Sequence, residues 1–201
     1  LKRIQTRIRA EEKEMPRIVA YFENWLKRQP NEGEAYFGLA LAQRRMGALD
    51  RAVDSLKQAA SLSAGDGEIL RELGNTYFLK GSFPDARRYL EDAGRLIPRD
   101  GMTYVCLGLV HFEQSEPQPS LLAFLRAKEL LPDYPEVYYH LGRAYGGVGQ
   151  LGLAYQNFGQ YYKAIGDNRI AISHFQKALA YYDEKSPERR TTGPRTCGAS
   201  S

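Results

Sequence analysis

Residues 35–64 read AYFGLALAQRRMGALDRAVDSLKQAASLSA, and this stretch holds the pattern that decides the fold. Its Tyr36, Leu39 and Ala40 recur three more times, each set displaced by 34 residues from the last. A repeat of fixed length predicts stacked copies of one small structural unit rather than a single closed core. The corresponding residues in the later copies are Leu70, Leu73 and Gly74, then Tyr104, Leu107 and Gly108, then Tyr138, Leu141 and Gly142.

The spacing inside the unit predicts two amphipathic helices. Apolar residues at positions 4, 7 and 11, and again at 20, 24 and 27, recur at helical spacing. Gly47, Gly81 and Gly149, near position 15, are predicted to end the first helix, because glycine accepts the left-handed backbone of a helix C-terminus. Pro98 and Pro132, at position 32, are predicted to stop the second.

The small residues of the unit predict close contact between its two helices, with Ala40 facing Ala52 and Gly74 facing Ala86. One hairpin cannot bury its own apolar stripe, so neighbouring hairpins are expected to stack. The pattern resembles the tetratricopeptide repeat (TPR). That resemblance implies an all-α fold, a right-handed solenoid of stacked antiparallel helix hairpins.

The repeat divides the chain into an array with two irregular ends. The array is expected over 31–183, with units at 33–66, 67–100, 101–134 and 135–166 and a half-unit at 150–183 that uses the helix 152–164 a second time. Asp167 is the predicted N-cap of the last helix. Residues 1–30 are expected to form N-terminal helices of a degenerate capping repeat, and residues 184–201 a flexible tail without apolar periodicity.

Composition and motifs exclude several classes of function. With 28 Lys and Arg against 24 Asp and Glu, the chain has a net charge of +4, which is too mild to favour a nucleic-acid partner. No apolar run is long enough to span a membrane. His111, His140 and His174 lack metal-ligand spacing, and His111 and Cys106 are predicted core residues. We therefore expect no catalytic residue, no metal and no cofactor.

A protein-binding surface is what remains, because the first helices of stacked units are expected to line a concave groove. Its exposed apolar residues predict a protein or peptide partner, with packing against a neighbouring domain or a second copy as the alternative. The predicted groove residues are Phe37, Leu41, Arg71, Asn75, Phe78, Val105, Leu109, Phe112, Tyr139 and Arg143.

A narrower resemblance concerns residues 135–179, PEVYYHLGRAYGGVGQLGLAYQNFGQYYKAIGDNRIAISHFQKAL. This segment is similar to the C-terminal TPR region of BepA-like periplasmic zinc metallopeptidases, in which an L-x-x-A-Y-x-x-x-G turn leads into a doubly used helix that ends in Tyr-Tyr and a Gly turn. The opening residues 1–46 also resemble the region that follows such a peptidase domain. The matching residues are Leu141, Ala144, Tyr145, Gly149, Tyr161, Tyr162 and Gly166.

The second resemblance implies that this chain, which begins at Leu1, is a piece of a bacterial metallopeptidase involved in outer-membrane protein quality control. The catalytic H-E-x-x-H domain would then lie upstream, and no catalytic residue carries over. The implied partners are that peptidase domain and outer-membrane assembly proteins, and the implied compartment is the periplasm, with the cytoplasm as the alternative. The competing hypothesis is a free-standing TPR scaffold or adaptor of a different multiprotein complex.

Overall fold

The computed structural model describes residues 15–184. Within that range the chain forms ten α-helices and no strand, which confirms the predicted all-α class. Residues 1–14 of the predicted N-terminal helices lie outside the described residues. So does the predicted tail, apart from Glu184 at the end of the last helix.

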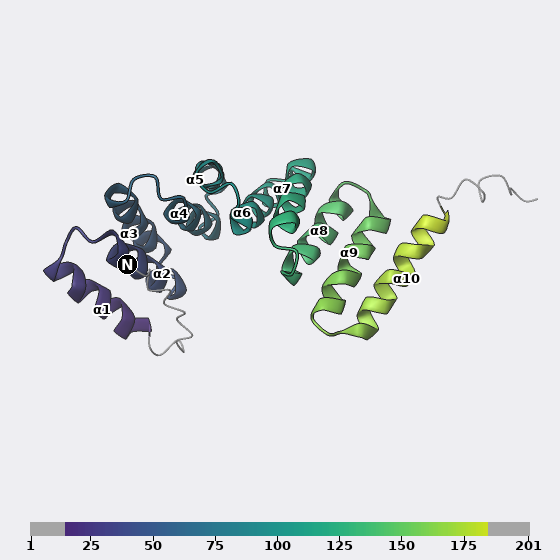
Figure 1. Ribbon diagram of the computed structural model, residues 1–201, viewed down its shortest axis with the longest axis horizontal. Helices are drawn as coiled ribbons and strands as arrows, with labels where there is room; N and C mark the ends of the chain where they lie inside the picture. Colours follow the sequence, from purple (N-terminus) through teal and green to yellow (C-terminus); the bar gives the residue numbers. More distant parts are fainter. Residues whose placement is uncertain (1–14, 185–201) are drawn as a thin grey trace, which may run out of the picture. The chain divides into compact units, whose positions relative to one another are not determined.

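The chain divides into two compact units, residues 1–114 and 115–201, whose helices Figure 1 labels. Within each unit, consecutive helices pack against one another. Unit 1 contains α1 (Met15–Arg28), α2 (Gly33–Arg45), α3 (Leu49–Leu62), α4 (Gly67–Leu79), α5 (Phe83–Leu96) and α6 (Gly101–Glu113). Unit 2 contains α7 (Pro117–Leu130), α8 (Pro135–Gly147), α9 (Leu151–Ala164) and α10 (Asn168–Glu184).

Glycines let the helices of each hairpin approach closely. A Cβ atom on Gly74 of α4 would lie 2.6 Å from Cγ of Leu90 and 3.1 Å from the carbonyl oxygen of Ala86 on α5. A Cβ atom on Gly142 of α8 would lie 2.6 Å from Cε1 of Phe158 on α9. Both contacts leave no room for a side chain, as the predicted role of small residues requires.

The turns between helices follow the predicted backbone chemistry. Gly47, Gly81 and Gly149 have φ values of 74°, 75° and 75°. Ser115 occupies the same place in the third repeat with φ 59°, so a serine there adopts a backbone that glycine accepts more easily. Asp167 accepts a hydrogen bond from the Ile170 amide at 3.1 Å, which confirms it as an N-capping residue of α10.

A tyrosine at position 4 often accompanies the proline that ends the preceding helix. The Tyr104 hydroxyl donates to the Pro98 carbonyl at 3.2 Å, and the Tyr138 hydroxyl donates to the Pro132 carbonyl at 2.9 Å. The repeat that begins with α4 has Leu70 in place of this tyrosine and Ala64 in place of the proline. The two residue types are therefore present or absent together.

The helix α1 closes one end of unit 1, where the repeat pattern degenerates. It begins one residue before Pro16, which therefore lies in its first turn, where a missing amide hydrogen is tolerated. The Phe22 ring, 4% exposed, covers Gly38 of α2. Trp25 stands where a small residue is the rule and stacks on Phe22 with ring centroids 6.2 Å apart. Large rings thus replace the small-residue contact at this end.

Candidate protein-binding surface

Eight of the ten predicted groove residues lie on α2, α4 and α6, the first helices of the three repeats in unit 1. Helix α4 contacts α6 directly as well as through α5. The first helices therefore lie next to each other at this place. We call the exposed and half-buried face of α2, α4 and α6 the unit 1 surface.

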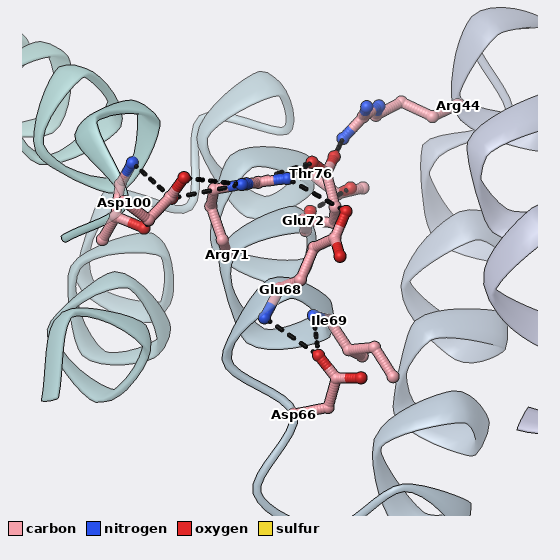
Figure 2. Close-up of polar contacts among 9 residues, drawn as sticks. Arg44, Asp66, Glu68, Ile69, Arg71, Glu72, Thr76 and Asp100 are labelled. Carbon is pink, nitrogen blue, oxygen red and sulfur yellow. Dashed lines mark hydrogen bonds and ion pairs between the residues drawn. The ribbon is translucent and has the colours of Figure 1, made fainter. Parts of the chain in front are cut away.

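A row of alternating charges runs across the unit 1 surface. Arg44 of α2 contacts Glu72 of α4, with Nη1 2.5 Å from Oε2. Arg71 of α4 donates to Glu72 Oε1 from Nη2 at 2.8 Å, and to both carboxylate oxygens of Asp100 from Nη1 at 3.1 Å. Figure 2 shows these four side chains in sequence from α2 to the start of α6. We call them the charge ladder.

Arg71 is held by carboxylates of its own chain. Its side chain is 17% exposed, and Glu68 Oε1 also lies 3.5 Å from Nη2. Burial opposes charging of the guanidinium, but the charges and hydrogen bonds of Glu72 and Asp100 outweigh it, so the pKa of Arg71 is raised above its usual value. Most of the charge that Arg71 would offer a partner is therefore already neutralised within unit 1.

Asp100 links the ladder to the backbone of α6. As the N-cap of α6 it accepts hydrogen bonds from the Thr103 amide at 3.0 Å and the Thr103 hydroxyl at 2.6 Å. The same carboxylate receives Arg71. One side chain thus caps the start of α6 and joins two repeats.

Cys106 lies beneath the ladder and is 8% exposed, as its prediction as a core residue requires. Burial raises the pKa of its thiol to about 12, with a further contribution from the Glu72 charge. The thiol is therefore protonated at neutral pH. His111, the predicted core histidine, is also buried, at 8% exposure.

Apolar side chains, together with Asn75, form a further part of the unit 1 surface. Phe78 is half-buried and its ring lies 5.8 Å from that of Phe83, while the neighbouring Leu79 is 52% exposed. Phe37, Leu41, Leu109 and Phe112 are half-buried, as is Asn75. Val105 is a correction to the predicted groove, because at 4% exposure it belongs to the core and offers no surface.

The other two predicted groove residues, Tyr139 and Arg143, lie on α8 of unit 2. Tyr139 is 37% exposed, and its ring centroid lies 5.8 Å from that of Phe158 and 5.3 Å from that of Tyr161 on α9. Arg143 is half-buried and contributes to lowering the pKa of His140, although burial is the larger cause. This surface consists mainly of aromatic rings.

Sequence reasoning missed Glu72 and Asp100 as partners of Arg71, and it missed Arg44 as the second partner of Glu72. The signal was available in the repeat arithmetic, because Arg44 and Glu72 are 28 residues apart and Arg71 and Asp100 are 29 apart. Residues separated by nearly one repeat length face each other across neighbouring first helices. A search for opposite charges at that separation would have found the ladder.

No group of three or more His, Cys, Asp or Glu side chains in residues 15–184 could hold a metal ion. None of the helices described is both long enough and apolar enough to cross a membrane.

Comparison with solved structures shows the same fold. The crystal structure of MamA superposes with a TM-score of 0.64 at 24% identity, covering 87% of this chain and 92% of that one. The thermophilic TPR protein TTC0263 of Thermus thermophilus gives 0.65 at 22% identity, covering 84% and 92%. A chain of the APC/C hetero-tetramer Cut9–Hcn1 gives a TM-score of 0.68 at 21% identity, covering 89% of this chain and 39% of that one.

Two curated proteins match over parts of the sequence. The CTR9 homolog of Arabidopsis thaliana is 31% identical over 96 residues, which are 48% of this chain and 9% of that protein. The BBSome complex member BBS4 of Bos taurus is 26% identical over 153 residues, 68% of this chain and 29% of that protein. The chain thus spans less than a third of either relative.

Family models decide the classification. One model described as a tetratricopeptide repeat matches residues 19–67 and 43–101, and a second matches residues 152–184. Together these segments cover more than half of the chain and include helices of both units. TPR domains are non-catalytic interaction modules built on stacked hairpins. The chain belongs to the tetratricopeptide repeat family and is a helical protein-interaction scaffold.

Proposed function

We propose that the unit 1 surface binds a segment of a partner protein, with Phe78 and Leu79 as its central apolar contacts. The observation that carries this proposal is the pairing of exposed apolar side chains with a charge ladder that is already neutralised. Leu79 is 52% exposed, whereas Arg71 is bound to Glu72 and Asp100. Burial of apolar side chains, rather than an ion pair with Arg71, would then supply most of the binding affinity.

Two of the similar proteins belong to larger assemblies, which supports such a role for this chain. BBS4 is a member of the BBSome complex, and Cut9 forms a hetero-tetramer with Hcn1. BBS4 matches 68% of this chain, and a chain of the Cut9–Hcn1 complex matches 89% of it. A scaffold that presents its first helices to another protein is the function that fits this fold and the exposed residues of unit 1.

A photo-cross-linker placed at position 78 tests the proposal. The cross-linked protein would be identified, purified and titrated against the chain. The double variant Phe78→Ala, Leu79→Ala should weaken its binding by at least about tenfold, since central apolar anchors carry most interface energy.

The matched control is the pair Arg87→Ala and Arg88→Ala on α5, a second helix. It should leave the affinity unchanged within about twofold, because both side chains belong to α5, outside the unit 1 surface, and form ion pairs with Glu91 and Asp85 of the same helix. Circular dichroism must be equal for all variants. If the α5 pair weakens binding and the α4 pair does not, the partner binds the second helices instead.

We further propose that the chain is the C-terminal module of a periplasmic zinc metallopeptidase, on the basis of the sequence similarity in residues 135–179. The arrangement of α9 is compatible with the doubly used helix of that family. Phe158 of α9 packs on Gly142 of α8, and the adjacent Gly159 is covered by Phe175 of α10. In that setting the partner would be the peptidase domain or an outer-membrane assembly protein.

The coding sequence upstream of Leu1 tests this placement. An H-E-x-x-H helix there, preceded by a secretion signal, would support the metallopeptidase. An upstream region that encodes further TPR units or another domain without that motif would contradict it and favour the free-standing scaffold.

A further inference from the structure

His174 lies in the contact between α9 and α10. Its ring stacks on that of Tyr162 of α9, with the centroids 5.2 Å apart and the planes at 5°. The rings of Tyr155 and Phe158, also on α9, have centroids 5.8 and 5.5 Å from that of His174. The Nδ1 atom of His174 is buried and has no hydrogen-bond partner among residues 15–184. The imidazole therefore occupies a mainly aromatic site.

The surroundings of His174 do not favour a positive charge on its ring. From α9 it faces the phenols of Tyr155 and Tyr162, which are neutral at and below pH 7. On α10, Tyr181 stacks on Tyr155, and the Lys177 ammonium lies 5.5 Å from the centre of the Tyr155 ring. Burial lowers the pKa of His174, and the charge of Lys177 lowers it further.

Protonation would add a second N–H group to the buried imidazole. A buried donor without an acceptor destabilises the contact that buries it. The attraction between a cation and the Tyr162 ring offsets part of this cost, but it leaves the new proton without an acceptor. The proton therefore binds more readily when α10 is apart from α9, and acid favours that separated form as the pH falls below about 6.5.

The helix α10 is free to separate because it is packed on one side. Among the described helices it packs substantially against α9 alone, whereas α9 also packs against α8. His174 stands between Ala171 and Ala178, which are both 3% exposed, and next to Phe175, which covers Gly159 of α9. A helix with a single neighbour can leave it without unfolding the rest of the structure.

We propose that protonation of His174 releases α10 from α9, so that mildly acidic pH reversibly opens the last hairpin of unit 2. Opening uncovers Gly159 and the rings of α9 that α10 now contacts. The hairpin of α8 and α9 stays closed, because Phe158 keeps its contact with Gly142. Acid thus changes the face of α9 that another protein can meet, independently of the partner proposed for the unit 1 surface.

Amide hydrogen exchange of the full 201-residue chain, read by mass spectrometry of its peptides, tests the proposal. Exchange at about pH 7.5 and about pH 5.5 is corrected for the intrinsic rate at each pH. In the wild type, protection of α10 should fall by at least about threefold on acidification, while that of α8 stays nearly constant. His174→Phe keeps a ring of similar size but does not titrate, so its α10 should be equally protected at both pH values.

The matched control is His140→Phe on α8, because His140 is also a unit 2 histidine in a ring stack, with Phe124 at 5.1 Å. It should leave the acid response of α10 as in the wild type. If His174→Phe disturbs the packing at neutral pH, His174→Gln gives the same comparison, since it also lacks the titrating group.

Protection of α10 that does not fall with pH, or that falls as much in both His174 variants, overturns the proposal. So does an equal fall throughout α8, α9 and α10, because acid would then unfold the whole unit rather than release one helix.

Discussion

The two units are built on one repeat but stabilise their first helices by different chemistry. In unit 1 the charge ladder joins α2, α4 and α6. In unit 2, rings connect α8, α9 and α10: Tyr139 lies 5.3 Å from Tyr161, and Tyr162 stacks on His174 at 5.2 Å. The repeat fixes the small and apolar positions between helices and leaves the remaining positions to be filled in either way. The two units should therefore respond differently to the same perturbation.

The largest difference is expected at the glycine contacts. Gly74→Leu should cost about 3 kcal/mol of unfolding free energy and Gly142→Leu about 1–2 kcal/mol. Gly74 meets the fixed carbonyl of Ala86, whereas Gly142 meets the Phe158 ring, which can rotate away. Urea unfolding measures both values, with fluorescence of the single tryptophan, Trp25, reporting on unit 1.

Gly146→Ala is the control for the glycine series, because a Cβ atom on Gly146 of α8 would meet no packed neighbour within 4 Å. It should be neutral or stabilising by up to about 1 kcal/mol. Equal losses of unfolding free energy for Gly74→Leu and Gly142→Leu would contradict this prediction. They would show that the Phe158 ring gives way no more easily than the Ala86 carbonyl.

The second difference concerns salt. Arg71→Ala should destabilise unit 1 by about 1–2 kcal/mol, between the values typical of exposed and buried ion pairs, because the side chain is 17% exposed. In 1 M NaCl that loss should shrink, since surface charges are screened. Arg87→Ala, which breaks an exposed pair with Glu91, should change stability by less than about 0.5 kcal/mol. A loss for Arg71→Ala that salt leaves unaltered would assign its effect to packing.

Alkaline pH should weaken unit 1 through Cys106. Burial raises the pKa of this thiol from 9.0 to about 12, so the folded state holds its proton more tightly than the unfolded state. The resulting stabilisation is complete below pH 9 and is lost as pH rises toward 12. Between pH 8 and pH 10 the wild type should lose about 1 kcal/mol more than Cys106→Ala, both in a Cys197→Ser background. Identical pH profiles from Trp25 fluorescence would contradict this.

A fall in pH should have the smallest effect on stability, and it should destabilise unit 2. Burial lowers the pKa of His140, and the nearby charge of Arg143 lowers it further, although the charge of Glu136 acts in the opposite direction. Burial also lowers the pKa of His174, with a smaller contribution from the charge of Lys177. The folded state therefore favours the neutral imidazoles, and the stability that this gives is complete above the unfolded-state pKa near 6.5. It is lost as the pH falls below that value. Far-UV circular dichroism during urea unfolding at pH 7 and pH 5.5 should show a loss that the double variant His140→Gln, His174→Gln abolishes. If the double variant loses as much stability between pH 7 and pH 5.5 as the wild type, the two histidines are not the cause.

The sequence predicted the helices well because every repeat carries the same local signals. The glycines near position 15 fixed the turns, and even Ser115 took the same left-handed backbone. The candidate surface was less predictable. Val105 fits the groove register but is buried, and the charges that engage Arg71 lie on other turns and helices. Periodicity within one helix reveals which residues share a face, but not which residues of the next repeat meet them.

The double use of α9 has a consequence for mutational tolerance. Phe158 fills the contact with α8, while its neighbour Gly159 must stay bare for Phe175 of α10. These two adjacent residues are therefore constrained by different helices, Phe158 by α8 and Gly159 by α10. Ala154 and Asn157 are both buried and are constrained as well. A saturation mutagenesis scan should find α9 the helix with the fewest permissive positions in unit 2. Variation would then accumulate in the other helices of unit 2, such as α7 and α10, faster than in α9.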